Sequence, residues 1–122
     1  MSVSTTQSML TDVVYGQASG NYDGSSQLFY SNVVPASNYY GGLGSIQTIY
    51  YDLEGFVGVI TVQATLNDLP EQAHWVDISE RGDGTTIDTG LTTDTVTGNF
   101  SWVRVQVNGF DAGTIASVRI VY

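Results

Sequence analysis

The 122-residue chain contains no cysteine, no lysine, two prolines and one histidine. Without cysteine it has neither a disulfide framework nor a thiolate metal site. A single histidine, His74, does not build a His-rich metal centre, and we interpret it as a structural or exposed residue. We therefore expect no metal and no cofactor.

Positive charge is scarce. Three arginines stand against 12 acidic residues, which gives a net charge of −9. Neutralising phosphate groups takes a patch of cations, so nucleic acid and anionic membranes are excluded as expected partners. Arg104 and Arg119 lie in alternating segments, and two interpretations stay open. Each either pairs with a carboxylate or aromatic ring of its own chain, or contacts another subunit.

Long apolar runs are also missing. No stretch approaches the ~18 residues that a membrane span needs. The first residues, 1–6, are rich in Ser and Thr and lack the basic and apolar regions of a signal peptide. We expect a protein made in the cytoplasm without a signal peptide.

Strand-forming residues and turns dominate what is present. Val, Ile, Tyr and Thr alternate with polar residues, and 14 glycines separate the runs. The chain is long enough for one core but needs no second domain. The pattern predicts a single all-β domain over residues 1–122, a jelly-roll-like antiparallel β-sandwich of seven or eight short strands with a polar arm at residues 1–7.

The clearest strand pattern lies in residues 98–122. Val103, Val105 and Val107 share one face of a first strand, and Val118, Ile120 and Tyr122 share one face of a second. The Gly-containing connection at 108–113 is compatible with an antiparallel pair or with two strands linked at a corner. We expect the last strand to be an inner one.

Further strands are predicted at residues 9–15, 27–34, 46–53, 58–66 and 75–79, with 46–53 and 58–66 at the centre. Segment 80–94 is expected to be a hairpin and loop. The predicted inward residues are Ile49, Tyr51, Leu53, Ile60, Val62, Ala64 and Leu66, with Trp75 as a core candidate and Ile87 and Leu91 as loop anchors.

Binding residues are predicted mainly from aromatic side chains. Tyr39 and Tyr40 stand beside three glycines in a predicted loop. They either form a stacking platform for a sugar ring or a partner surface, or pack onto the sandwich edge. Together with Trp102, Arg104 and Arg119 they form the candidate interaction surface.

Catalytic and metal-binding patterns are weak. No G-x-S-x-G motif accompanies the many serines. The spacing of Asp83, Asp88 and Asp94 does not match an EF-hand loop. Arg81, Gly82 and Asp83 spell the integrin-binding tripeptide, which we interpret as a turn. We expect a protein without catalytic activity.

Four segments, residues 55–66, 73–78, 98–105 and 113–122, resemble small virion structural proteins of T4-like tailed phages, such as those of marine cyanobacteria. The resemblance implies a place in the virion as a capsid decoration, fibre-like or tail-accessory component. It also implies other virion proteins as partners and a homo-oligomer, for which we favour a trimer.

The same segments are similar to galactose-binding-like jelly-roll domains, in which Trp102-Val103-Arg104 takes the place of an R-Y-V-R-type strand. This resemblance implies, as the alternative, a carbohydrate-binding module that stacks aromatic residues on host-surface glycans. The paired cysteines and sugar-contacting loop arginines of those modules have no counterpart here.

Overall fold

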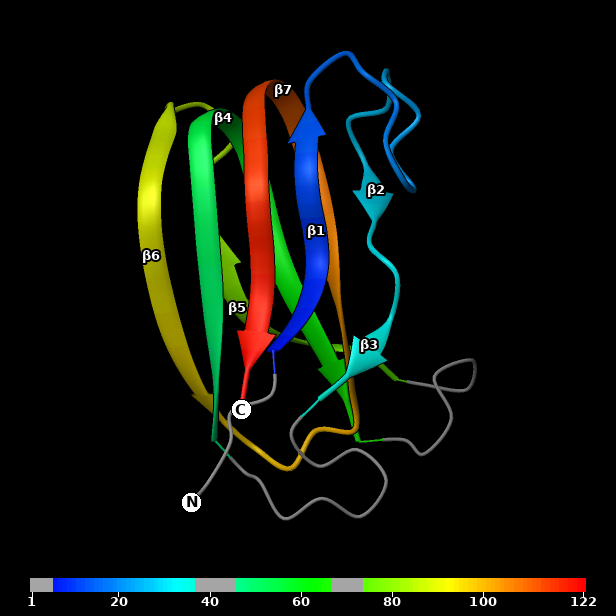
Figure 1. Cartoon of the computed structure of the whole chain (residues 1–122), viewed down its shortest axis with the longest axis vertical. Helices are drawn as coiled ribbons and strands as arrows, with labels where there is room; N and C mark the ends of the chain where they lie inside the picture. Colours follow the sequence, from blue (N-terminus) through cyan, green and yellow to red (C-terminus); the bar gives the residue numbers. More distant parts are fainter. Residues whose placement is uncertain (1–5, 37–45, 67–73) are drawn as a thin grey trace.

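Two 20-residue strands, β4 and β7, run through the whole molecule (Figure 1). The structure is a computed structural model, and it describes residues 6–36, 46–66 and 74–122. The strands are β1 (Thr6–Val14), β2 (Phe29–Tyr30), β3 (Val34–Pro35), β4 (Ile46–Thr65), β5 (Val76–Arg81), β6 (Asp88–Thr97) and β7 (Trp102–Val121).

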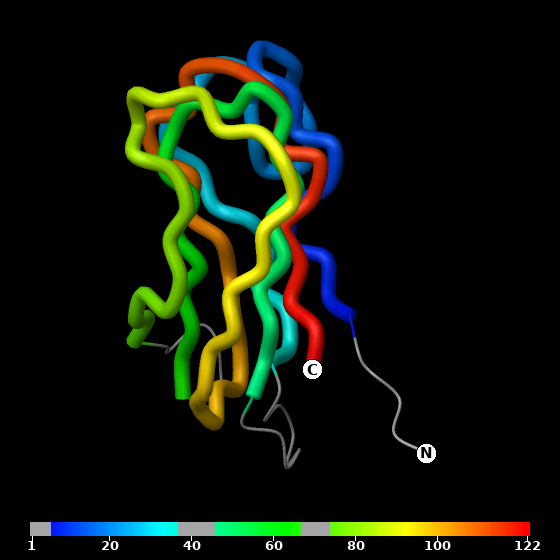
Figure 2. Tube along the Cα trace, turned by 90° about the vertical axis from the view of Figure 1, so that its left-hand side faces the viewer, coloured from blue at the N-terminus to red at the C-terminus, as the bar shows by residue number. Residues whose placement is uncertain are grey.

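All seven strands belong to one antiparallel sheet that folds over on itself. In the first layer, the order is β6, the first half of β4, the second half of β7, and β1. In the second layer, the order is β5, the second half of β4, the first half of β7, and the short strands β2 and β3. Figure 2 shows the two layers from the side. The predicted all-β, sandwich-like antiparallel fold is confirmed.

Glycines allow β4 and β7 to bend together at the closed end of the sandwich. Gly113 has a φ of 90°, and a Cβ added to it would lie 2.2 Å from the carbonyl oxygen of Gly55. The pairing register between β4 and β7 shifts at this point, between Glu54 and Val59. The connection at 108–113 is therefore a corner within one strand, and the alternative of an adjacent antiparallel pair is excluded.

The core lies between the two layers. The rows Val103, Val105, Val107 and Ile60, Val62, Ala64 are fully buried, as predicted. In the first layer Ile49, Tyr51 and Leu53 face them, together with Val118 and Ile120. Tyr22, Phe29, Phe56 and Phe110 fill the closed end, with ring centroids of neighbouring pairs 4.9 to 6.0 Å apart.

The ends of the chain differ from the prediction in part. Thr6 and Gln7, expected in a polar arm, begin β1, and residues 1–5 lie outside the described residues. The second half of β7 lies between β1 and β4, so the last strand is an inner one, as predicted. No helix occurs among the described residues, and hence none there is suited to crossing a membrane.

The strand predicted at residues 27–34 is wrong in its continuity. β2 and β3 are separate two-residue strands on either side of Ser31, which is 6% exposed. The Ser31 hydroxyl accepts a hydrogen bond from the Val105 amide at 2.8 Å. A side chain thus replaces the missing backbone acceptor, and β7 stays paired across the interruption.

Four predicted core residues are exposed or half-exposed. Leu66 is 67% exposed just after the end of β4, and Trp75 is half-buried on the outer surface before β5. Ile87 and Leu91 are 69% and 64% exposed. Leu91 lies in the edge strand β6 and pairs with Asp52 of β4. The side chains at this position of the register face away from the core. Segment 80–94 is the end of β5, a turn, and most of β6.

Candidate functional site

The outer surface of the second layer carries the candidate site, which we call the Arg104 face. Its side chains come from β2, β4, β5 and β7 and from Trp75, which directly precedes β5. Gln63 on β4 pairs with Arg104 on one side and with Asp77 on the other, so these three side chains form a row across the sheet. The exposed or half-buried members of the Arg104 face are Tyr30, Gln63, Trp75, Asp77, Glu80, Trp102, Arg104 and Gln106, while Thr61 and Thr65 on the same side of β4 are buried beneath them.

Aromatic rings and a hydrogen-bond chain hold Arg104 in place. Its guanidinium carbon lies 4.6 Å from the ring centroid of Tyr30 and 4.5 Å from that of Trp75. Its Nε donates to Gln63 Oε1 at 2.8 Å, and Gln63 Nε2 donates to Asp77 Oδ1 at 3.0 Å. Stacking covers the faces of the guanidinium group, while the edge formed by the two terminal nitrogens keeps its hydrogen-bond donors.

The charge of Arg104 has no carboxylate partner among the described residues. Between those residues the single ion pair joins Arg81 to Asp88. Asp77, the acidic residue of this hydrogen-bond row, accepts its hydrogen bond from Gln63 and not from Arg104. Arg104 is thus an ordered cation on a sheet surface, in a chain whose net charge is −9. Such a group binds a planar carboxylate or a polar partner with little loss of side-chain entropy.

The predicted interaction residues do not form one surface. Trp102 and Arg104 lie on the same face of β7, with Trp102 paired between Pro35 and Thr65. Arg119 lies in the first layer, exposed, with its guanidinium carbon 5.8 Å from the Tyr50 ring centroid. Two interpretations were open for these arginines, a partner within the chain or a contact with another subunit. Both arginines contact aromatic side chains of their own chain, and a contact with another subunit stays a prediction. Tyr39 and Tyr40 lie outside the described residues.

Sequence reasoning missed the part played by Tyr30, Trp75 and Asp77. The alternation of β4 places Gln63 on the outer side, but nothing in the sequence tells which residues of β5 and β7 stand beside it. A tryptophan at the start of a strand suggests a core residue on composition alone. The cation partner that draws Trp75 to the surface lies 29 positions away, at Arg104.

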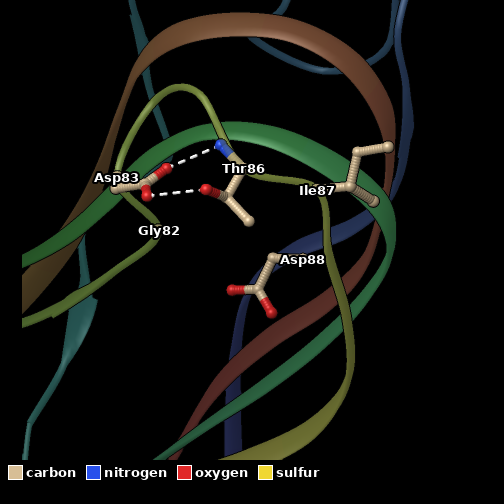
Figure 3. A pocket seen from close by; sticks show the side chains of 5 residues that line it. All are labelled: Gly82, Asp83, Thr86, Ile87 and Asp88. Carbon is tan, nitrogen blue, oxygen red and sulfur yellow. Dashed lines mark hydrogen bonds between the residues drawn. The ribbon is translucent and has the colours of Figure 1, made fainter.

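A second surface feature is a shallow hollow of about 240 Å³ at the turn between β5 and β6, lined by Gly82, Asp83, Thr86, Ile87 and Asp88 (Figure 3). Asp83 Oδ1 accepts hydrogen bonds from the amides of Thr85 and Thr86, and Oδ2 accepts one from the Thr86 hydroxyl. These bonds, the Thr86 amide foremost, lower the Asp83 pKa from 3.8 to about 2.

The tripeptide Arg81-Gly82-Asp83 is engaged within the fold. Arg81 binds Asp88 through two hydrogen bonds, of 2.5 and 2.6 Å, and the bonded guanidinium lowers the Asp88 pKa. A Cβ on Gly82 would lie 2.3 Å from the Gly58 carbonyl oxygen. Each of the three residues therefore has a role in forming the turn, in agreement with its interpretation as a turn.

Asp83, Asp88 and Asp94, the aspartates whose spacing was compared with a calcium-binding loop, each bind a different partner within the fold. Asp83 belongs to its own turn, Asp88 to Arg81, and Asp94 accepts a 2.6 Å hydrogen bond from Ser79. Within residues 6–36, 46–66 and 74–122, no group of three His, Cys, Asp or Glu side chains is placed to hold a metal ion. His74 is exposed.

A buried polar contact joins the two layers beside the core. The hydroxyl groups of Tyr51 and Ser79 lie 2.5 Å apart, and Ser79 in turn donates to Asp94. Burial raises the Tyr51 pKa from 10.0 to about 12. The phenol thus stays neutral in neutral solution, and the arrangement supports a structural role that ties β5 to β4 and β6.

Comparison of the sequence with protein-family models and with curated proteins found no match. The geometry of the Arg104 face is therefore the main support for a functional assignment.

Proposed function

We propose that this chain is a non-catalytic structural protein of a phage virion that acts through protein-protein contacts made by the Arg104 face. The observation that supports a contact surface is the stack of Trp75, Arg104 and Tyr30 on the outer surface of the second layer. Trp, Tyr and Arg are the residue types that contribute most binding energy in protein interfaces.

Order in the free protein favours this assignment. Arg104 is already fixed by Gln63 and by two rings, and the β4–β7 pairing beneath it is continuous. A surface whose side chains are ordered before binding loses less conformational entropy when a partner docks. Placement in a virion rests on the resemblance of residues 55–66, 73–78, 98–105 and 113–122 to phage structural proteins.

The experiment is mass spectrometry of purified particles of a tailed phage that encodes this chain. We expect the protein in the particle at a fixed copy number, and we expect recombinant protein to bind particles that lack it. Trp75→Ala should weaken that binding, whereas Tyr50→Ala, an aromatic truncation in the opposite layer, should not. Absence from the particles together with no binding to them would contradict the proposal.

A second candidate function, glycan binding, is favoured by the polar groups beside the rings. Gln63, Asp77 and Arg104 offer hydrogen-bond donors and acceptors next to Trp75, a combination that suits sugar hydroxyls and a sugar ring. The net charge of −9 favours a neutral glycan over an acidic one.

A glycan array tests this candidate. Binding that is lost in Trp75→Ala and kept in Tyr50→Ala would support glycan recognition by the Arg104 face. Binding that is lost instead in the double variant Tyr39→Ala/Tyr40→Ala would place it on the predicted tyrosine platform. No binding to any arrayed glycan would exclude the candidate for the glycans tested.

A further inference from the structure

We propose that the Arg104 face binds a second copy of the chain, about a two-fold axis that runs along β4. The inference rests on the proposed function, since it names the partner of the same surface. The two layers would then meet sheet to sheet, with the β4 strand of one copy over that of the other.

The order of strands on this face permits a two-fold contact. The second half of β4 lies between β5 and the first half of β7, and both neighbours run antiparallel to it. Rotation by 180° about an axis that is parallel to β4 and lies between the two copies places β4 of the second copy over β4 of the first and exchanges the two sides. In the second copy β7 therefore lies over β5 of the first, and β5 lies over β7.

The charge pattern of the Arg104 face becomes complementary to itself under this rotation. Asp77, Gln63 and Arg104 form one row, with Gln63 at the axis. The rotation brings Arg104 of each copy opposite Asp77 of the other, which makes two ion pairs per dimer. The terminal nitrogens of Arg104, which no carboxylate of the described residues binds, are the donors that these pairs require.

The neighbouring positions agree with the same axis. Thr61 pairs with Glu80 and with Gln106, so a second row places an acid opposite an amide donor of the other copy. Trp75 precedes Asp77 by two residues and Trp102 precedes Arg104 by two, on strands of the same direction. The rotation therefore also brings the two tryptophans opposite each other. Self-complementarity of this kind is what a two-fold interface requires.

The size of the face sets the strength of the contact. Three strand segments of about five residues cover less area than the roughly 800 Å² per partner of a standard interface. The two copies also repel each other through their net charges of −9. We expect a reversible dimer that forms with rising concentration and is strengthened by moderate salt, which screens the long-range repulsion.

Sedimentation equilibrium from about 10 µM to about 1 mM covers the affinities expected of a small interface. We expect the weight-average mass to rise from 13.1 kDa towards twice that value. A mass that stays at that of the monomer, or that converges on three copies, would overturn the two-fold contact. Binding of the same sample to particles would leave the proposed function standing.

Charge reversal provides the specific test. Arg104→Glu alone places two acids opposite each other, and Asp77→Arg alone places two arginines opposite each other, so each should weaken dimerisation by more than about tenfold. An equimolar mixture of the two variants restores both opposite-charge pairs in the heterodimer. We expect this mixture to associate as the wild type does.

The control is Arg119→Glu, the same reversal in the opposite layer, which should leave dimerisation unchanged. Near-UV circular dichroism verifies that each variant is folded. A mixture that stays monomeric although both variants fold would overturn the proposal.

A cross-linking measurement avoids the charge variants altogether. The chain lacks cysteine, so Gln63→Cys introduces one thiol, placed at the proposed axis. A short bismaleimide should join two such copies, whereas Asp52→Cys, on the outside of the first layer, should give little product. Equal yields for the two variants would also count against the proposal.

Discussion

At the scale of single residues, two short turns share one design. Asp23 and Asp83 are each followed by Gly and two hydroxyl residues, in the sequences DGSS and DGTT. Each carboxylate accepts hydrogen bonds from the backbone amides of the residues two and three positions later. It also accepts one from the hydroxyl group of the residue three positions later. The glycine at the second position has a φ of 92° or 84°, which favours glycine over other residues.

These hydrogen bonds are made to the ionised carboxylate, so they lower the pKa of both aspartates from 3.8 to about 2. The folded-state pKa lies below that of the unfolded chain. The ionised carboxylates of the two turns therefore stabilise the folded state above about pH 3.8. Their contribution to the free energy of unfolding is lost as the pH falls through about 2.

Carboxyl NMR titration checks this prediction. We expect midpoints near 2 for Asp23 and Asp83. Thr86→Val removes one hydroxyl donor and should raise the Asp83 pKa part of the way towards 3.8, while Asp23 serves as the unchanged internal control. Midpoints near 3.8 for both groups in the wild type would contradict the turn geometry.

At the scale of elements, the corner shared by β4 and β7 depends on close backbone contact. We expect Gly113→Ala to lower the free energy of unfolding by about 2 to 4 kcal/mol, because it adds both positive-φ strain and a clash with Gly55. Gly109→Ala is the matched control. It lies in the same corner with a φ of 65°, yet has nothing within 4 Å of the added Cβ.

The control should therefore cost only about 1 kcal/mol, the backbone term alone. Urea unfolding of the two variants and the wild type measures the difference. Equal losses for Gly109→Ala and Gly113→Ala would mean that the corner tolerates a side chain and that the close approach is not needed.

Much of the element pattern was predictable because alternation reports which residues share a face. The rows Ile49, Tyr51, Leu53 and Val103, Val105, Val107 were assigned correctly to the core for this reason. Alternation does not report what covers each face. Leu91 was misassigned because β6 turns out to be an edge strand whose outer side is uncovered.

The candidate site was less predictable than the core. Arg104 and Trp102 were identified, but the stack with Trp75 and the hydrogen bond with Gln63 depend on strand pairing across 29 and 41 positions. Pairing partners at such separations follow from the topology, which a single sequence does not specify. Arg119, identified on the same grounds as Arg104, lies on the opposite layer.

At the scale of the whole molecule, the protection of backbone amides against hydrogen exchange should differ between strands. β4 and β7 have paired neighbours on both sides, whereas β5 and β6 pair only with β4. We expect amides in the middle of β4 and β7 to exchange with deuterium only through global unfolding. Amides on the unpaired edge of β6 should exchange faster. Native-state exchange followed by NMR measures this, and uniform rates across the strands would contradict the sheet order.

The sharing of β4 and β7 between both layers also bears on how the chain folds. The two strands are joined along nearly their full length, from Thr48 with Val121 to Thr65 with Trp102, so each layer obtains its central pair from the same ladder. A species that contains one finished layer and one disordered layer would have to break this ladder at the corner. The refolding reaction is thus expected to follow a single exponential and to be slow, because the rate-limiting nucleus joins segments distant in the chain.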